Sequence, residues 1–295
     1  MTIRSMELTH RLAARAWWHG IAIATLLIAS GAFLPHAVVD AHSQVAEALG
    51  DLKSPDWNTR AKAFYTLISS GLGDELHGRT WLVPSALAAL LKQDPARSDH
   101  IKVGLIELLV KENRTARRPT GDWSGPPRLT EEYTNYWGDV VAAVAALKDQ
   151  RALDALMANL WSGNMATNAV AGLGRAALDR VTPLTNDPDV VMRNGAVRTL
   201  SQMLDPANAQ ALGGGDGVAK IEAALRQATR DKEPEVRISA IEGLGKLTNP
   251  DIIPILTSLA QRDPYQRPGD AVGSLSYPVR EAAAKALANR SALPK

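Results

Sequence analysis

Side chains suited to binding a partner gather between Glu112 and Asp139. The stretch from 112 to 130 is rich in arginine and proline, so we predict a long irregular loop there, and long loops are often functional. Arginine and aromatic side chains are the types that anchor protein interfaces. We therefore predict a partner-binding or capping surface made of Arg114, Arg117, Arg118, Trp123, Arg128, Tyr133, Tyr136 and Trp137. The alternative is a solvated linker that tucks Trp123 onto the rest of the protein.

A glycine-rich run at 212–218, followed by Lys220, resembles a phosphate-binding loop. Backbone N–H groups at a helix start do bind anions. However, no Lys-Ser/Thr pair follows the last glycine, and no strand precedes the run. We therefore interpret it as a linker between helices, with Asp216 or Gly217 capping a helix that begins at Val218.

Residues with the spacing of a catalytic or metal centre are not apparent in the sequence. The histidines that follow residue 41 lack a spacing such as His-x-x-x-His; they are His42, His77 and His100. Adjacent carboxylates such as Glu131 and Glu132 fit solvated turns better than a desolvated acid pair. We predict no catalytic residues, no metal and no cofactor, and hence a protein that is not an enzyme.

Composition narrows the possible partners further. The net charge is +2, which is too close to neutral for broad electrostatic binding of nucleic acid, so we expect no nucleic-acid partner. The chain contains no cysteine, which excludes disulfides, thiolate metal sites and a cysteine nucleophile.

The first forty residues have the pattern of a secretory signal peptide. A basic leader precedes a charge-free run at 21–34, and small or aliphatic residues at 39–41 precede His42. We predict a signal peptide over 1–41 and an exported protein, periplasmic or secreted. The alternative is a retained inner-membrane anchor over 20–39, which is about the length of a membrane span. A membrane partner is expected only in that case.

The pattern Arg-x-x-Ala-x-x-x-Leu recurs along the remaining chain. These positions share one face of a helix with 3.6 residues per turn. The small residue allows a paired helix to approach closely, and the leucine fills the groove beside it. The arginines are Arg60, Arg193, Arg237 and Arg280.

We expect the recurring arginines to stabilise the packing of neighbouring helices. Asp56, Asp189 and Glu235 lie just before three of them, near the expected helix starts. We predict that each arginine pairs with an acidic residue in its own or the adjacent repeat. Such a ladder fixes the stacking of helices and has no catalytic implication.

The expected second helices carry proline beside aliphatic residues, as at Val83-Pro84, Pro183-Leu184 and Ile253-Pro254. Proline is tolerated in the first turn of a helix, so these pairs indicate helix starts or kinks. With V-M-R-N-G-A ending at Ala196 and E-V-R-I-S-A-I-E-G-L-G at 235–245, the chain resembles HEAT-repeat proteins over about residues 54–290. It is most similar to the short-repeat bacterial kind that resembles phycobilisome-lyase repeats.

This resemblance implies an all-α solenoid over 42–295, built from about six to seven stacked helical hairpins after the N-terminal signal helix. It also implies a scaffold that binds a protein partner through its curved surface and inserted loops. Two alternatives remain: a lyase-like or accessory enzyme subunit, and a membrane-tethered structural protein. The oligomeric state stays open.

The N-terminal prediction is tested by sequencing the N-terminus of the protein from the secreted and the membrane fractions. We expect a start near His42, because the small-residue site precedes it. A chain that keeps residues 20–39 and is found in the membrane fraction would contradict cleavage and favour the anchor.

Overall fold

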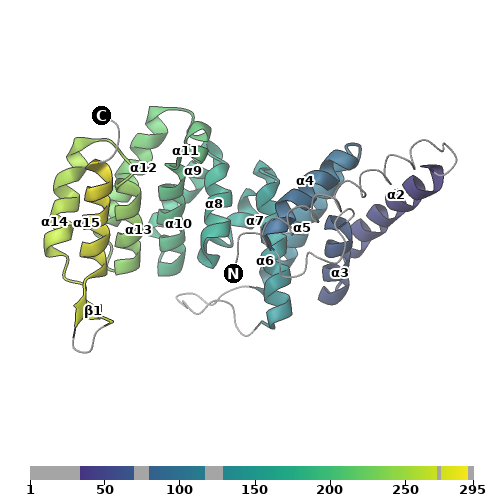
Figure 1. Ribbon diagram of the computed structural model, residues 1–295, viewed down its shortest axis with the longest axis horizontal. Helices are drawn as coiled ribbons and strands as arrows, with labels where there is room; N and C mark the ends of the chain where they lie inside the picture. The colour runs from purple at the N-terminus through teal and green to yellow at the C-terminus, as the bar shows by residue number, and fades with distance from the viewer. Residues whose placement is uncertain (1–33, 70–79, 117–128, 271–273, 292–295) are drawn as a thin grey trace, which may run out of the picture. The chain divides into compact units, whose positions relative to one another are not determined.

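The computed structural model describes residues 34–69, 80–116, 129–270 and 274–291. In this part of the chain the structure has fourteen α-helices, α2 to α15, and one short β-ribbon (Figure 1). The prediction of an all-α protein of paired helices is confirmed, apart from the ribbon. Most of the predicted signal segment lies outside the described residues. None of the described helices is long and apolar enough to cross a membrane.

The chain divides into two compact units, residues 1–70 and 71–295, and each is described by itself. The first unit contains α2 (Leu34–Asp51) and α3 (Trp57–Ile68), which pack against each other. The predicted cleavage point before His42 lies within α2. Helix α3 begins after Asp56, whose Oδ2 accepts a 2.8 Å hydrogen bond from the Thr59 N–H, as expected of an N-cap.

The second unit contains the remaining elements in chain order. Its α-helices are α4 (Val83–Gln93), α5 (Ser98–Thr115), α6 (Glu131–Ala146), α7 (Leu153–Met157), α8 (Asn164–Gly172), α9 (Arg175–Val181), α10 (Val190–Met203), α11 (Pro206–Ala209), α12 (Gly215–Ala228), α13 (Pro234–Leu244), α14 (Ile253–Arg262) and α15 (Pro278–Ser291). Short 3₁₀ helices are η2 (Thr80–Leu82), η3 (Gln150–Ala152), η4 (Leu160–Ser162), η5 (Thr182–Asn186), η6 (Gln210–Leu212) and η7 (Pro250–Ile252).

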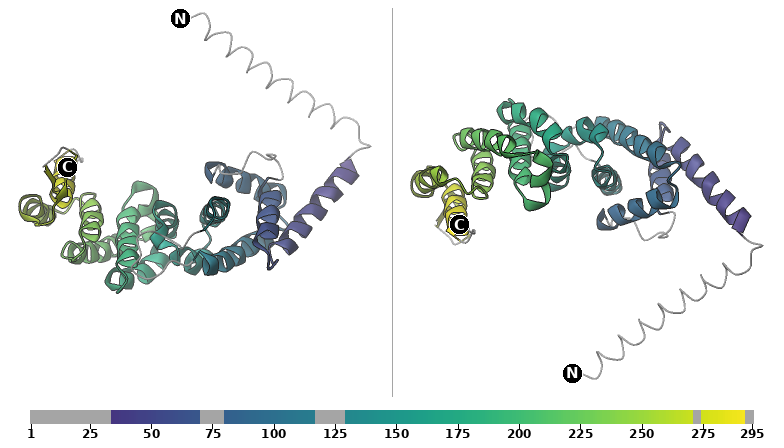
Figure 2. Two further views of the ribbon diagram at one scale, coloured as in Figure 1. Left: turned by 90° about the horizontal axis from the view of Figure 1, so that it is seen from below. Right: turned by 90° about the horizontal axis from the view of Figure 1, so that it is seen from above.

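The helices of the C-terminal repeats form two layers (Figure 2). In one layer α8 contacts α10, α10 contacts α13, and α13 contacts α15. In the other layer, α9 with η5, α12 and α14 cover the first layer from one side. Each helix pair thus buries its apolar stripe against its neighbours, as stacked repeats require.

The recurring motif supplies the core of this stack. Ala196 and Leu200 of α10, and Ala240 and Leu244 of α13, are completely buried. In α15 the alanine of the motif, Ala283, is also buried. The predicted role of positions 3 and 7 after the arginine is therefore confirmed in α10 and α13.

Prolines mark helix starts at two of the predicted places. Pro84 lies in the first turn of α4, and Pro254 lies in the first turn of α14. Pro183 behaves differently, because it lies in the 3₁₀ helix η5 that continues from α9.

The predicted start of the irregular loop, at residue 112, was wrong, whereas its predicted end at residue 130 coincides with the start of a helix. Residues 112–115 form the last turn of α5, and α6 begins at Glu131 after Thr130 caps it. The Thr130 side chain accepts a 3.2 Å hydrogen bond from the Tyr133 N–H. Residues 117–128 lie outside the described residues.

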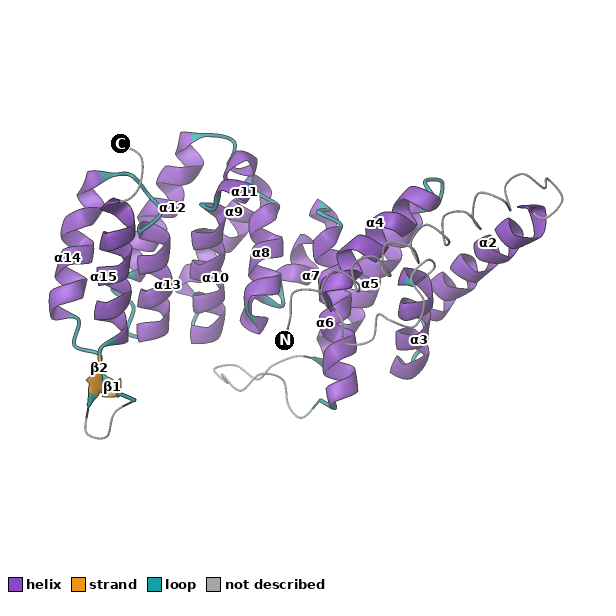
Figure 3. Cartoon of the chain, in the orientation of Figure 1, coloured by secondary structure: helices purple, strands orange, loops and turns teal. Residues whose placement is uncertain are grey.

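The insertion between α14 and α15 folds into an antiparallel ribbon of β1 (Arg267–Pro268) and β2 (Leu275–Ser276), with Arg267 opposite Ser276. The ribbon projects beyond the ends of α14 and α15 (Figure 3).

Close packing between helices generates a stability prediction at Gly195 in α10. A Cβ added there would lie 2.4 Å from the Leu160 carbonyl oxygen, so Gly195→Ala should destabilise the protein by about 1–3 kcal/mol despite the helix propensity of alanine. Gly138→Ala in α6 is the matched control, since a Cβ there meets nothing within 4 Å. It should be neutral or stabilising by up to about 1 kcal/mol. Urea unfolding measures both, and equal effects would contradict the packing.

Candidate functional site

Two buried arginines in the first layer each tie the start of a repeat to the connection that ends the same repeat. The Arg193 guanidinium donates from Nε and Nη2 to both carboxylate oxygens of Asp231, at 2.9 and 3.1 Å. Arg237 donates in the same way to Asp263, at 2.8 and 2.9 Å. Such bidentate pairs are strong and geometrically specific. Each aspartate lies after the next second-layer helix, so the ladder predicted for Arg193 and Arg237 is confirmed.

The third nitrogen of each arginine closes the turn that precedes its own helix. Arg193 Nη1 donates to the carbonyl oxygens five and six residues earlier, at 3.1 and 2.9 Å. Arg237 Nη1 does the same at 3.1 and 2.9 Å, and Arg60 of α3 at 2.8 and 2.9 Å. The same clamp therefore occurs in both units.

Arg280 keeps the position but uses different partners. Its Nε donates to the Asp263 carbonyl oxygen at 2.7 Å, and its guanidinium lies 4.3 Å from the centre of the Tyr277 ring. Asp263 is thus held by Arg237 through its side chain and by Arg280 through its backbone. These contacts fix the residue from which the β1–β2 insertion leaves α14.

The acidic residues that directly precede the arginines are not their partners in the ladder. The Asp189 side chain accepts a 3.0 Å hydrogen bond from the Val191 N–H and caps α10, much as Asp56 caps α3. Glu235 is exposed in the first turn of α13. The partners in the ladder come from the following connection instead.

Both members of the Arg193–Asp231 ion pair, which forms one rung of the ladder, stay charged. Burial disfavours ionisation of Asp231, but hydrogen bonds from Arg193 and from the Glu233 N–H outweigh it, so the pKa of Asp231 lies below its usual value. The hydrogen bond to Asp231 in turn raises the pKa of Arg193. Because the folded-state pKa of Asp231 is depressed, the rung stabilises the fold above about pH 4 and is lost as pH falls through that pKa.

The second layer carries a separate set of bridges between α9–η5 and α12. Its three contacts join residues that are 41 positions apart: Arg175 to Asp216 at 2.7 Å, Lys220 to Asp179 at 2.7 Å, and Gln227 to Asn186 at 2.8 Å. In the first contact the basic residue lies on α9, and in the second it lies on α12. Sliding one helix along the other by one turn would therefore place like charges opposite each other. These exposed pairs therefore set register more than stability.

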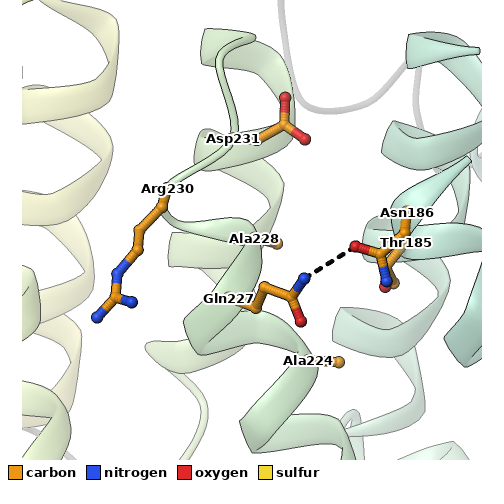
Figure 4. Close-up of a pocket in the computed structure, with 7 residues that line it drawn as sticks. All are labelled: Thr185, Asn186, Ala224, Gln227, Ala228, Arg230 and Asp231. Carbon is orange, nitrogen blue, oxygen red and sulfur yellow. Dashed lines mark hydrogen bonds between the residues drawn. The ribbon is translucent and has the colours of Figure 1, made fainter. Parts of the chain in front are cut away.

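Small polar grooves lie along these bridges, with volumes of about 220 and 420 Å³. Figure 4 shows Gln227 pointing across the smaller groove to Asn186, while Arg230 points away from them. Asp231, the acceptor of Arg193, lines the same groove. Side chains already bonded to one another line these openings, Gln227 with Asn186 in both and Lys220 with Asp179 in the larger.

A larger groove, of about 760 Å³, runs along α13 and α15 on the first layer. A Cβ added at Gly245 would lie 3.0 Å from the Ala286 Cβ, so the two helices approach closely there. The lining mixes small or aliphatic side chains with charged ones. It includes Ile238 and Glu242 of α13, Gly245 directly after α13, Ala282, Lys285 and Ala286 of α15, and residues 204–206, which lead from α10 into α11.

Of the residues predicted to bind a partner, the four that the structure describes do not form one exposed surface. Arg114 is exposed in the last turn of α5. Tyr133, Tyr136 and Trp137 of α6 are 4%, 1% and 7% exposed, which removes these three from a partner surface. They are buried because α6 packs against α4, α5 and α8. The other four, which are Arg117, Arg118, Trp123 and Arg128, lie outside the described residues.

A buried carboxylate explains the aromatic residues of α6. Glu112 of α5 is completely buried and accepts hydrogen bonds from the Tyr133 and Tyr136 hydroxyl groups, at 2.5 and 3.1 Å. Trp137 stacks on Trp161, with ring centres 5.4 Å apart. The sequence did not point to Glu112, although the spacing of Tyr133 and Tyr136 by three residues is that of one helix face.

The glycine-rich run is part of the second-layer bridges. Gly213 and Gly214 have φ of 75° and 127°, and α12 begins at Gly215. Asp216 therefore lies inside the first turn and binds Arg175, whereas the sequence predicted a cap at Asp216 or Gly217. Among the described residues, no three His, Cys, Asp or Glu side chains are placed to hold a metal ion.

Comparison with known families identifies residues 209–276 as HEAT repeats. The matched segment contains α12, α13, α14 and the Glu235–Gly245 motif, whereas the motif that ends at Ala196 lies before it. The match is to HEAT repeats in general and gives no support to a lyase-like subtype. No curated protein matches the chain in sequence.

The ladder generates a second stability prediction. Arg237→Met should destabilise the protein by about 3–5 kcal/mol, because it leaves the buried Asp263 carboxylate without its bidentate partner. Arg180→Met is the matched control, since Arg180 and Asp154 are both largely exposed and should contribute at most about 1 kcal/mol.

Urea unfolding, followed by helical circular dichroism, measures both variants. In Arg237→Met we also expect a separate early unfolding transition, because the connection between α14 and α15 loses its tie to α13. A loss of less than about 1 kcal/mol in a single transition would show that the rung does not couple the repeats.

Proposed function

We propose that this protein is a non-enzymatic scaffold that holds a protein partner in the groove between α13 and α15. HEAT repeats generally serve protein–protein interaction, and residues 209–276 supply α13 from such repeats. The proposal keeps the protein partner expected from the sequence but moves its contact surface away from α6.

One observation supports the proposal: residues of the recurring motif pack between helices, whereas residues outside the motif line the groove. In α10 and α13 the recurring arginine, alanine and leucine are buried between helices, where stacking uses them. The groove instead presents residues of α13 and α15 that do not recur, such as Ile238 and Ala282. Its volume of about 760 Å³ is that of a ligand-sized cleft, and its length follows two helices.

We also propose that the protein is exported and acts outside the cytoplasm. The basic leader, the apolar run at 21–34 and the small-residue site before His42 support this location.

Blocking the groove tests the proposal. Ala282 lines the groove and is half-buried, so Ala282→Trp should fill it. Ala284 is exposed on the same helix, so Ala284→Trp is the matched control for adding an indole to α15. Tagged wild-type protein and both variants are used to capture partners, and the interaction of any captured protein is then measured with purified components.

We expect the wild type and Ala284→Trp to bind the same protein, and Ala282→Trp to bind at least about tenfold more weakly. Thermal unfolding of all three proteins shows whether the indole has disturbed the fold. A partner that binds a folded Ala282→Trp variant as tightly as the wild type contradicts the groove. A variant with residues 117–128 replaced by a Gly-Ser linker of equal length then tests the segment first predicted from the sequence.

A further inference from the structure

The groove between α13 and α15 has the form of a cradle for one more helix. From α13 onward its residues follow one another at four-residue spacing, through Ile238 and Glu242 of α13 and Lys246 just after it. On α15 Pro278, Ala282 and Ala286 do the same. The twelve residues from Pro278 to Asn289 span about 17 Å of helix, or three turns.

No strand edge lines the groove, so an extended segment would find no row of backbone partners there. The lining comes from α13 and the residues just after it, from α15, and from residues 204–206, and most backbone N–H and C=O groups of the two helices are bonded within each helix. A helix satisfies its backbone internally, and small residues such as Gly245 and Ala282 let its apolar stripe approach closely.

Opposite charges on the two helices of the groove specify the flanks of that helix. Glu242 of α13 and Lys285 of α15 line the groove and are exposed, and neither has an ion-pair or hydrogen-bond partner among the described residues. Both stand five positions after a motif arginine, Arg237 and Arg280, so they occupy the same place on neighbouring helices.

The other charged groups along the groove are already engaged. Lys246 binds Asp205 at 2.7 Å, and Glu281 accepts hydrogen bonds from Ser276 Oγ and the Tyr277 N–H, at 3.1 and 3.0 Å. Glu242 and Lys285 are therefore the charges left for a ligand to pair with.

We infer that the groove binds an amphipathic α-helix of a partner protein, with a stripe of small or aliphatic residues, basic residues along the Glu242 flank and acidic residues along the Lys285 flank. This inference rests on the proposed scaffold function and names the kind of partner. Because the two flanks differ in charge, the groove selects one direction of the bound helix over the other.

Charge reversal on the protein tests the inference with three synthetic helical peptides that share one Ala/Leu stripe. Their flanks carry lysine on both sides, glutamate on both sides, or lysine on one side and glutamate on the other. Wild-type protein should prefer the mixed peptide. Glu242→Lys should shift the preference to the glutamate peptide and Lys285→Glu to the lysine peptide, each by about two- to fivefold in Kd, as expected of exposed pairs. The double variant should again prefer the mixed peptide.

Two controls complete the fluorescence-anisotropy measurement. Ala282→Trp should weaken all three peptides at least about tenfold, and Ala284→Trp should not. A mixed peptide with a central proline should bind worse, because it cannot form the helix. The inference is overturned if no helical peptide binds, if the proline peptide binds equally well, or if charge reversal leaves the preference unchanged. If the captured protein still depends on Ala282 in that event, the scaffold function stands without a helical ligand.

Discussion

The stacking of the repeats depends on giving each buried guanidinium group its hydrogen-bond partners. Arg193 and Arg237 each direct two nitrogens at an aspartate and a third at two carbonyl oxygens, so the donors of the buried group have partners. An unpaired charge in the interior is costly, which means that the arginine, its own entry turn and the next connection must be in place together. One side chain thus ties the start of a repeat to the end of that repeat.

The second layer is held in register by exposed ion pairs, which are weaker than the buried ones of the first layer. The bridges between α9–η5 and α12 are exposed, and such pairs contribute little stability. Their constant offset of 41 residues and their reversed charges instead favour one register. Buried rungs on one side and exposed bridges on the other therefore fix where each helix lies, including α13 beside α15.

The groove is a consequence of this fixed stacking. Gly245 and Ala286 bring α13 and α15 close together, and charged residues of both helices line the groove beside them. The residues of the recurring motif are used inside the stack, so the groove is lined mainly by residues outside that motif. Repeat proteins commonly combine a recurring framework with a surface that varies between repeats.

The sequence by itself determined the helices with the Arg-x-x-Ala-x-x-x-Leu motif and two of the proline-marked starts, because helical periodicity and capping depend on neighbours within a few residues. It also indicated that the arginines form a ladder. Only the tertiary structure decided that Asp231 and Asp263 are the partners, 38 and 26 residues away, because stacking brings distant connections together. It likewise buried Tyr133 and Tyr136 against Glu112 and opened the groove between α13 and α15, since the burial of a side chain depends on which helices pack over it.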